Sequence, residues 1–182
     1  GAEIELGRLS LAKVENSVAI AARSQTDGRA VAVGASFLGS AIGAGGGVVQ
    51  QAQLVRARIF GEGTLQAKGA TLSGSSGNRL RGMAGVLSVT DELAFGGTLG
   101  AAELKARSVA EVDGARLILG TGGLQLDAGD TTRALGLGTA AAASFGGQTG
   151  IAAANGVVLS ASAVDALLTR SAITSKGGIG AN

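Results

Sequence analysis

A short phrase recurs along this chain at nearly regular spacing. It reads GRLSLA, GTLQAK and GGLQLDA, and its first leucine falls at Leu9, Leu65 and Leu124. A fourth copy begins at Gly177 and has Ile179 in place of the leucine, so the copies follow one another at a period of about 56 residues. Self-similarity at such a period indicates a solenoid, a propeller or an array of small units. The repeat therefore constrains the fold more than any other feature of the sequence.

The local hydrophobic period within each repeat is two residues. Val55, Ala57 and Ile59 alternate with arginines, and Ile4 and Leu6 alternate with glutamates. This alternation is typical of strands with one buried and one solvated face. Clusters such as TDG (26–28) and SGSSGN (73–78) predict turns between strands of four to six residues.

The composition limits both the core and the chemistry. Hydrophobic residues make up 46% of the chain but aromatics only 2%, and there are 33 glycines with no Cys, His, Pro, Trp or Tyr. The core must therefore be aliphatic and narrow, and a propeller, whose blades usually carry aromatic signatures, is disfavoured. Disulfides, thiolate chemistry and histidine general bases are excluded.

These observations predict an all-β, single-stranded parallel β-helix (β-solenoid). Because a typical solenoid coil has about 19 residues, each repeat is expected to form roughly three coils. The whole chain would then be a rod of nine or ten coils, on the order of 45 Å long. We interpret residues 1–182 as one fragment of a longer protein, with units at 7–62, 63–121 and 122–176 and the start of another at 177–182.

The order of segments resembles a known group of proteins. An A-x-I strand, a G-x-L-x-[LA]-x-A strand and an Ala/Gly-rich stretch such as AVAVGASFLGSA follow one another. This order is similar to the repeats of large bacterial exoproteins and adhesins, especially leukotoxin-type filamentous adhesins and the filamentous-haemagglutinin-like group. The resemblance implies a right-handed β-helix, secreted or displayed on the bacterial surface, that serves as a stalk or adhesive rod. Its partners would be receptors or glycans on a host or neighbouring cell, and no catalytic residue carries over.

Three weaker features suggest chemistry. GLGTAAA (136–142) has the shape of a dinucleotide loop, but the context of a following helix and a well-placed acid is missing, so a turn in a Gly-rich repeat is favoured. Asp127, Asp130 and Arg133 suggest an alternative, a polysaccharide-active β-helix with these residues in a groove. Asp91 and Glu92 form a second carboxylate pair. Solvated charges beside turns explain these carboxylates more simply, so no catalytic, cofactor-binding or metal-ligating residue is assigned.

A third hypothesis is a glycine-zipper module inserted in a membrane, because 31–55 and 134–164 are long uncharged runs with spaced glycines. The corresponding middle stretch carries Arg79, Arg81, Asp91 and Glu92. Charges at mid-bilayer cost several kcal/mol each, so we expect no membrane span. The formal charge of +2 comes without a basic cluster interleaved with aromatics, so nucleic acid is not expected as a partner. Solenoid ends expose unpaired backbone groups, which predicts end-to-end self-association.

Overall fold

The structure is a computed structural model that describes residues 1–37 and 41–182. Strands make up nearly all of the described chain, and none of its residues is helical. The strands are β1 (Ala2–Leu6), β2 (Leu11–Lys13), β3 (Val18–Phe37), β4 (Ala41–Gly61), β5 (Thr64–Thr90), β6 (Ala94–Asp113), β7 (Arg116–Ser144), β8 (Gly150–Thr169), β9 (Ala172–Ser175) and β10 (Ile179–Ala181).

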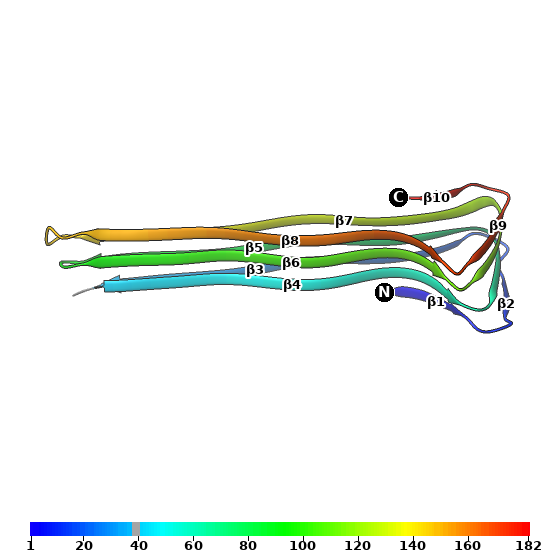
Figure 1. Cartoon of the computed structure of the whole chain (residues 1–182), viewed down its shortest axis with the longest axis horizontal. Coiled ribbons are helices and arrows are strands. Elements are labelled where there is room, and N and C mark those ends of the chain that lie inside the picture. Colours follow the sequence, from blue (N-terminus) through cyan, green and yellow to red (C-terminus); the bar gives the residue numbers. More distant parts are fainter. Residues whose placement is uncertain (38–40) are drawn as a thin grey trace.

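The strands form two sheets in which every described pair is parallel. Sheet A has the order β1-β4-β6-β8, and sheet B the order β10-β7-β5-β2, with β3 also on β5 and β9 on β7. The chain passes from one sheet to the other at each end of the long strands, so successive strands alternate between the two layers (Figure 1). The expectation of an all-β chain of stacked parallel strands is confirmed, in an arrangement consistent with a parallel β-helix. Its handedness stays a prediction.

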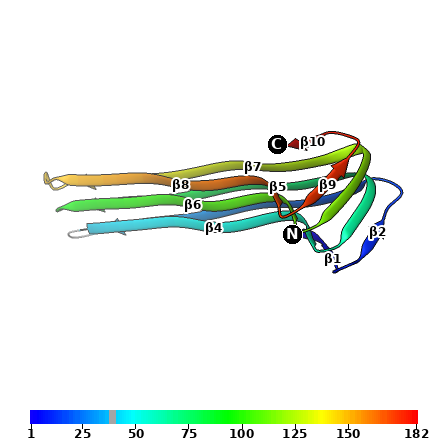
Figure 2. The same ribbon diagram turned by 45° about the vertical axis from the view of Figure 1, so that its right-hand side comes forward.

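The number of coils differs from the expectation. Val18 lies beside Ala70, and Ala70 lies beside Leu124, so one repeat separates neighbouring strands in sheet B. Sheet A has the same offset, because Ala41 lies beside Ala94. Each repeat therefore makes one wide coil of two long strands, and the prediction of roughly three short coils per repeat is wrong. The long axis of the molecule lies along the strands (Figure 2).

The strand register reproduces the sequence alignment only in part. Ile179 lies beside Leu124, as the alignment predicts. Leu65, however, lies beside Ala12 and Leu117 rather than beside Leu9 and Leu124. A bulge between Ala67 and Gly69 shifts the register within β5, which a constant period cannot represent.

The clusters predicted as turns lie inside long strands. TDG belongs to β3 and SGSSGN to β5, so the predicted strand length of four to six residues is wrong. Close approach of the two sheets explains many of these glycines. A Cβ atom on Gly82 would overlap the carbonyl oxygen of Ala101, and one on Gly100 would overlap that of Leu137. Glycine is used here to bring two backbones together across the interior.

The sheets are joined by tight corners at one end of the molecule. Gly61 and Gly114 have φ values of 111° and 75°, which favour glycine. The third corner has Arg170 with φ 49°, and its Nη2 lies 2.9 Å from Asp113 Oδ1 in the coil below. A salt bridge thus ties a strained corner to its neighbour.

The larger of the two buried aliphatic clusters in the described residues lies beside these corners. Ile20, Leu72 and Leu126 occupy the same position in successive coils of sheet B and form a ladder in which Leu72 is fully buried. Such ladders confirm the expected aliphatic interior. The other buried members of this cluster are Leu6, Ala22, Val55, Ala57, Ile59, Leu65, Ala67, Ala70, Ala110, Val112, Ala115, Leu117, Leu119 and Leu124.

Farther from the corners, the strands form a thin blade of two sheets. Its outer faces expose aliphatic side chains, including Val33 and Ile42, which are 83% and 77% exposed. The long apolar runs 31–55 and 134–164 fall on β3–β4 and β7–β8, although residues 38–40 lie outside the described part. Within the described residues, no helix is long and apolar enough to cross a membrane.

Candidate functional site

The alternation along β7 separates the residues proposed for a polysaccharide-cleaving groove. Asp127 and Arg133 lie on the outer face, and Asp130 points into the interior toward Ser76. Asp127 instead accepts hydrogen bonds from Gln125 Nε2 at 2.8 Å and Asn182 Nδ2 at 3.1 Å. The structure therefore does not bring the two carboxylates to one face, as paired acid and base catalysis would require.

The second carboxylate pair lies at the opposite end of the molecule from the corners. Asp91 and Glu92 are exposed in the turn between β5 and β6. Thr90 Oγ1 accepts a hydrogen bond from the Glu92 backbone nitrogen at 3.1 Å, and it lies 3.4 Å from Asp91 Oδ1. These contacts shape the turn, in agreement with the simpler explanation of solvated charges.

GLGTAAA forms part of the long strand β7. It is neither a phosphate-binding loop nor the turn that its glycines predict. The extended backbone continues through Ser144, so no helix N-terminus is available to bind a dinucleotide pyrophosphate.

Asp130 lies in a polar cluster inside the coils. It accepts hydrogen bonds from Ser76 Oγ, from Thr132 Oγ1 at 2.7 Å and from Asn78 Nδ2 at 3.3 Å. Ser76 and Ser108 approach from opposite sheets, with 3.0 Å between their hydroxyl oxygens. The interior therefore changes from aliphatic ladders to a hydroxyl-rich segment between the core and the blade.

The charge of Asp130 is stabilised by these donors. Partial burial acts to raise the pKa of the carboxyl, but hydrogen bonds from Ser76, Thr132, Ser162 and Asn78 outweigh burial and lower it. Among the described residues, no group of three or more acidic side chains could hold a metal ion. The cluster is thus equipped to accept hydrogen bonds and to connect coils.

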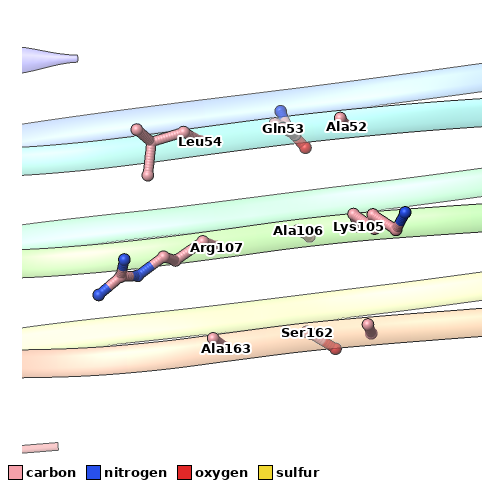
Figure 3. A pocket seen from close by; sticks show the side chains of 9 residues that line it. Ala52, Gln53, Leu54, Lys105, Ala106, Arg107, Ser162 and Ala163 are labelled. Carbon is pink, nitrogen blue, oxygen red and sulfur yellow. The ribbon is translucent and has the colours of Figure 1, made fainter.

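A shallow hollow of about 590 Å³ lies on the outer face of sheet A (Figure 3). Lys105 and Arg107 project from β6, with Ala52 and Leu54 of β4 on one side and small side chains of β8 on the other. Lys105 Nζ lies 3.2 Å from Glu103, and Arg107 Nε lies 2.8 Å from Asp165. Both cations are paired, and methyl groups line most of the remaining surface, so this hollow offers few groups to orient a ligand.

The outer face of sheet B carries a longer, more polar depression, which we call the arginine groove. Three adjoining hollows of about 470, 280 and 290 Å³ share lining residues along β3, β5 and β7. Gly77 lines the first two hollows and contributes no side chain, which leaves the floor open. The outward side chains that line the groove are Arg23, Gln25, Asp27, Ser75, Arg79, Arg81, Thr131, Arg133 and Leu135.

Cations outnumber acids among the residues that line this groove. Arg79 and Arg133 are direct neighbours on adjacent strands, and Asp27 lies on the other side of Arg79. Asp27 is 3.7 Å from Arg29. Within the part of the chain that the structure describes, the guanidinium groups of Arg79, Arg81 and Arg133 form no hydrogen bond or ion pair. Like charges on adjacent strands repel one another, so this arrangement favours a bound anion.

Sequence reasoning missed the groove because its arginines are distant along the chain. Arg79 and Arg133 are one coil apart, and they become neighbours only through the register of β5 and β7. The groove could have been predicted from the spacing of its basic residues. Residues that lie one repeat apart, in the same phase of the two-residue alternation, share a face of the sheet.

No protein-family model, curated protein or solved structure matches the chain.

Proposed function

We propose that the chain is a structural and adhesive segment of a secreted or cell-surface bacterial exoprotein. The observation that carries this proposal is the register in which each repeat forms one coil, seen in β3–β5–β7 and in β4–β6–β8. The strands of each coil pair with those of the coils beside it. Further repeats can therefore be added in the same way, and the sheets then form broad outer faces. Growth proceeds across the strands, which makes the segment a wide ribbon rather than a thin rod.

The distribution of polar groups supports a role in reach and surface contact. Ion pairs on the outer face of sheet A join successive coils, as Arg58 does with Glu111 at 3.2 Å and with Asp113 at 2.7 Å. The guanidinium of Arg58 also lies 4.5 Å from the ring centre of Phe60. These contacts fix the register between coils and leave the faces available for binding.

Surface labelling of intact cells that produce the protein tests the location. Antibodies raised against the purified chain are expected to label cells without permeabilisation, and brief external protease treatment is expected to remove the signal. Labelling that appears only after the envelope is opened would contradict the proposal. An antibody against a cytoplasmic enzyme provides the control, because it should label permeabilised cells but not intact ones.

A second copy of the chain is the proposed partner at the coil ends. In the described structure, β3 pairs only with β5 and β8 only with β6, so each offers a long unpaired edge. Such edges recruit other strands. Sedimentation velocity over a hundredfold concentration range is expected to show growing assemblies, whereas a single monomer boundary throughout would contradict this proposal.

The absence of catalysis is also a prediction. Incubation with a panel of acidic and neutral glycans is expected to release no new reducing ends. Turnover that disappears in Asp127→Asn would overturn the prediction and support the enzymatic alternative.

A further inference from the structure

We infer that the arginine groove binds a linear acidic polysaccharide. This inference deepens the proposed adhesive role by naming the class of partner that the outer face of sheet B would hold. Three features of the groove favour such a ligand: its shape, its unpaired guanidinium groups and the side chains between them.

The groove is elongated along the strands. Outward positions from Ser75 to Arg81 follow one another every second residue on β5, and they cover about 20 Å at the usual rise of a strand. Gly77 and, one strand away, Gly129 contribute no side chain, and a Cβ on Gly129 would meet no atom within 4 Å. The open floor thus continues across strands and accepts an extended chain lying along the face.

The charges suit a ligand with repeated anionic groups. Arg23 lines one end of the groove, and Arg79, Arg81 and Arg133 cluster at the other. A guanidinium presents a planar fork that matches carboxylate and sulfate oxygens in pairs. Because this groove holds unpaired cations while Lys105 and Arg107 on sheet A are paired, the anion is expected on sheet B.

The groups between the arginines favour sugars over other polyanions. Gln25, Ser75 and Thr131 supply an amide and two hydroxyls that can exchange hydrogen bonds with sugar hydroxyls. The lining residues include no aromatic side chain, so the groove lacks the stacking platforms on which single-stranded nucleic acids depend.

Binding to immobilised polysaccharides tests the inference with the intact chain. Polygalacturonate supplies carboxylates, dextran sulfate supplies sulfates, and neutral dextran is the uncharged control. At least one acidic polymer is expected to bind, with affinity that falls as salt rises, and dextran is not. The acidic polymer that binds more tightly identifies the anionic group. Failure of both acidic polymers, or tighter binding of oligodeoxythymidylate, would overturn the inference.

Paired substitutions locate the binding site. Arg79→Gln with Arg133→Gln is expected to weaken binding roughly tenfold or more, as expected for the loss of charged hydrogen bonds. Lys105→Gln with Arg107→Gln removes the same charge from sheet A and is expected to change affinity less than about twofold. Equal losses in the two variants would overturn the site, because binding would then follow net charge alone.

Two further variants separate shape from charge. Arg79→Lys with Arg133→Lys keeps the charge but removes the fork, and it is expected to restore only part of the affinity. Gly77→Val fills the floor without changing charge and is expected to weaken binding, whereas Gly97→Val on the outer face of sheet A is not. Wild-type affinity in both the lysine and the Gly77→Val variants would overturn recognition by the groove. Circular dichroism and scattering measure whether the solenoid is folded. Loss of binding with an unchanged fold would concern the groove alone, whereas loss of the folded solenoid would concern the proposed structural role.

Discussion

At the scale of single residues, interior polar groups and outer ion pairs define how coils stack. Asp130 accepts hydrogen bonds across coils and sheets, and Asp113 is held between Arg58 and Arg170. The pKa of Asp113 is lowered mainly by the hydrogen bond from Arg170; burial opposes this effect, and Arg58 adds to it. Both carboxylates therefore contribute stability when they are ionised.

The sign of the resulting pH dependence follows from these directions. A carboxyl whose pKa is lower in the folded state stabilises the fold above its unfolded pKa, near pH 4, and this contribution is lost as the pH falls through the folded pKa. We expect the free energy of unfolding to decrease below about pH 4. Denaturant titrations between pH 2 and pH 7 measure this decrease, and a stability that is flat over that range would contradict the assignment.

Ser76→Ala removes a buried donor to Asp130. It is expected to lower the free energy of unfolding by about 1–3 kcal/mol near neutral pH, the usual value for a hydrogen bond to a charged group. It should also move the loss of stability to higher pH, because the carboxylate is less well stabilised. Ser75→Ala, at the outward neighbouring position, is the control and is expected to change neither quantity. Equal effects of the two substitutions would argue against the interior cluster.

At the scale of strands, glycines determine how closely the two sheets pack. Gly47, Gly100 and Gly156 occupy one position in three successive coils of sheet A. A Cβ on Gly100 or Gly156 would collide with the backbone of β7. The strands can therefore remain long and straight without large side chains between them.

Gly100→Ala tests this packing. The added methyl group would overlap the carbonyl oxygen of Leu137, and we expect a loss of about 2–3 kcal/mol in the free energy of unfolding. Gly97→Ala is the matched control on the same strand, since its Cβ would meet no atom within 4 Å and alanine restricts the unfolded chain. Chemical denaturation measures both. Similar stabilities of the two variants would show that the sheets do not approach as described.

The aliphatic ladder supports a second test at this scale. Leu72→Ala removes the buried middle of the ladder between Ile20 and Leu126 and is expected to cost about 2–5 kcal/mol. Leu87→Ala, on the outer face of the same strand and 42% exposed, is expected to cost less than about 1 kcal/mol. A smaller loss for Leu72→Ala than for Leu87→Ala would contradict the assignment of the two faces of β5.

At the scale of the whole molecule, one repeat is the unit of folding. Thr64 lies beside Arg116 in the register of β5 and β7, so these residues occupy equivalent places in successive coils. Removing a whole coil between them leaves β4 followed by β7 and places Ile20 next to Leu126. The architecture should accept such a change, because each coil contacts only its neighbours.

Deletion of residues 64–115 is therefore expected to leave a folded, shorter solenoid. The variant should keep a strand-type circular dichroism spectrum and unfold cooperatively. Deletion of 70–88, about the length of one short coil, should abolish folding, because it leaves β6 without a full partner strand across the interior. If the shorter deletion were tolerated and the longer one were not, the coil would have the length that the sequence alone suggested.

Much of this architecture could be predicted from the sequence. The alternation of Val55, Ala57 and Ile59 with arginines indicates strands, because a two-residue period places apolar side chains on one face. The recurrence of the GxL phrase indicates stacked units, and the lack of large aromatics indicates a narrow aliphatic core. These properties are local or periodic, so they can be read without knowing which strands meet.

The tertiary structure alone decided the width of the coil, the register and the sites. The sequence does not reveal that Gly82 and Gly114 have different roles. In the structure, Gly82 lies in a strand against the backbone of the opposite sheet, whereas Gly114 has a positive φ at a corner. Likewise, Asp127 and Asp130 are close in the chain but face opposite sides of β7, whereas Arg79 and Arg133 are far apart and become neighbours. Contacts between strands one repeat apart depend on register, and a one-residue change of register would turn every side chain to the other face.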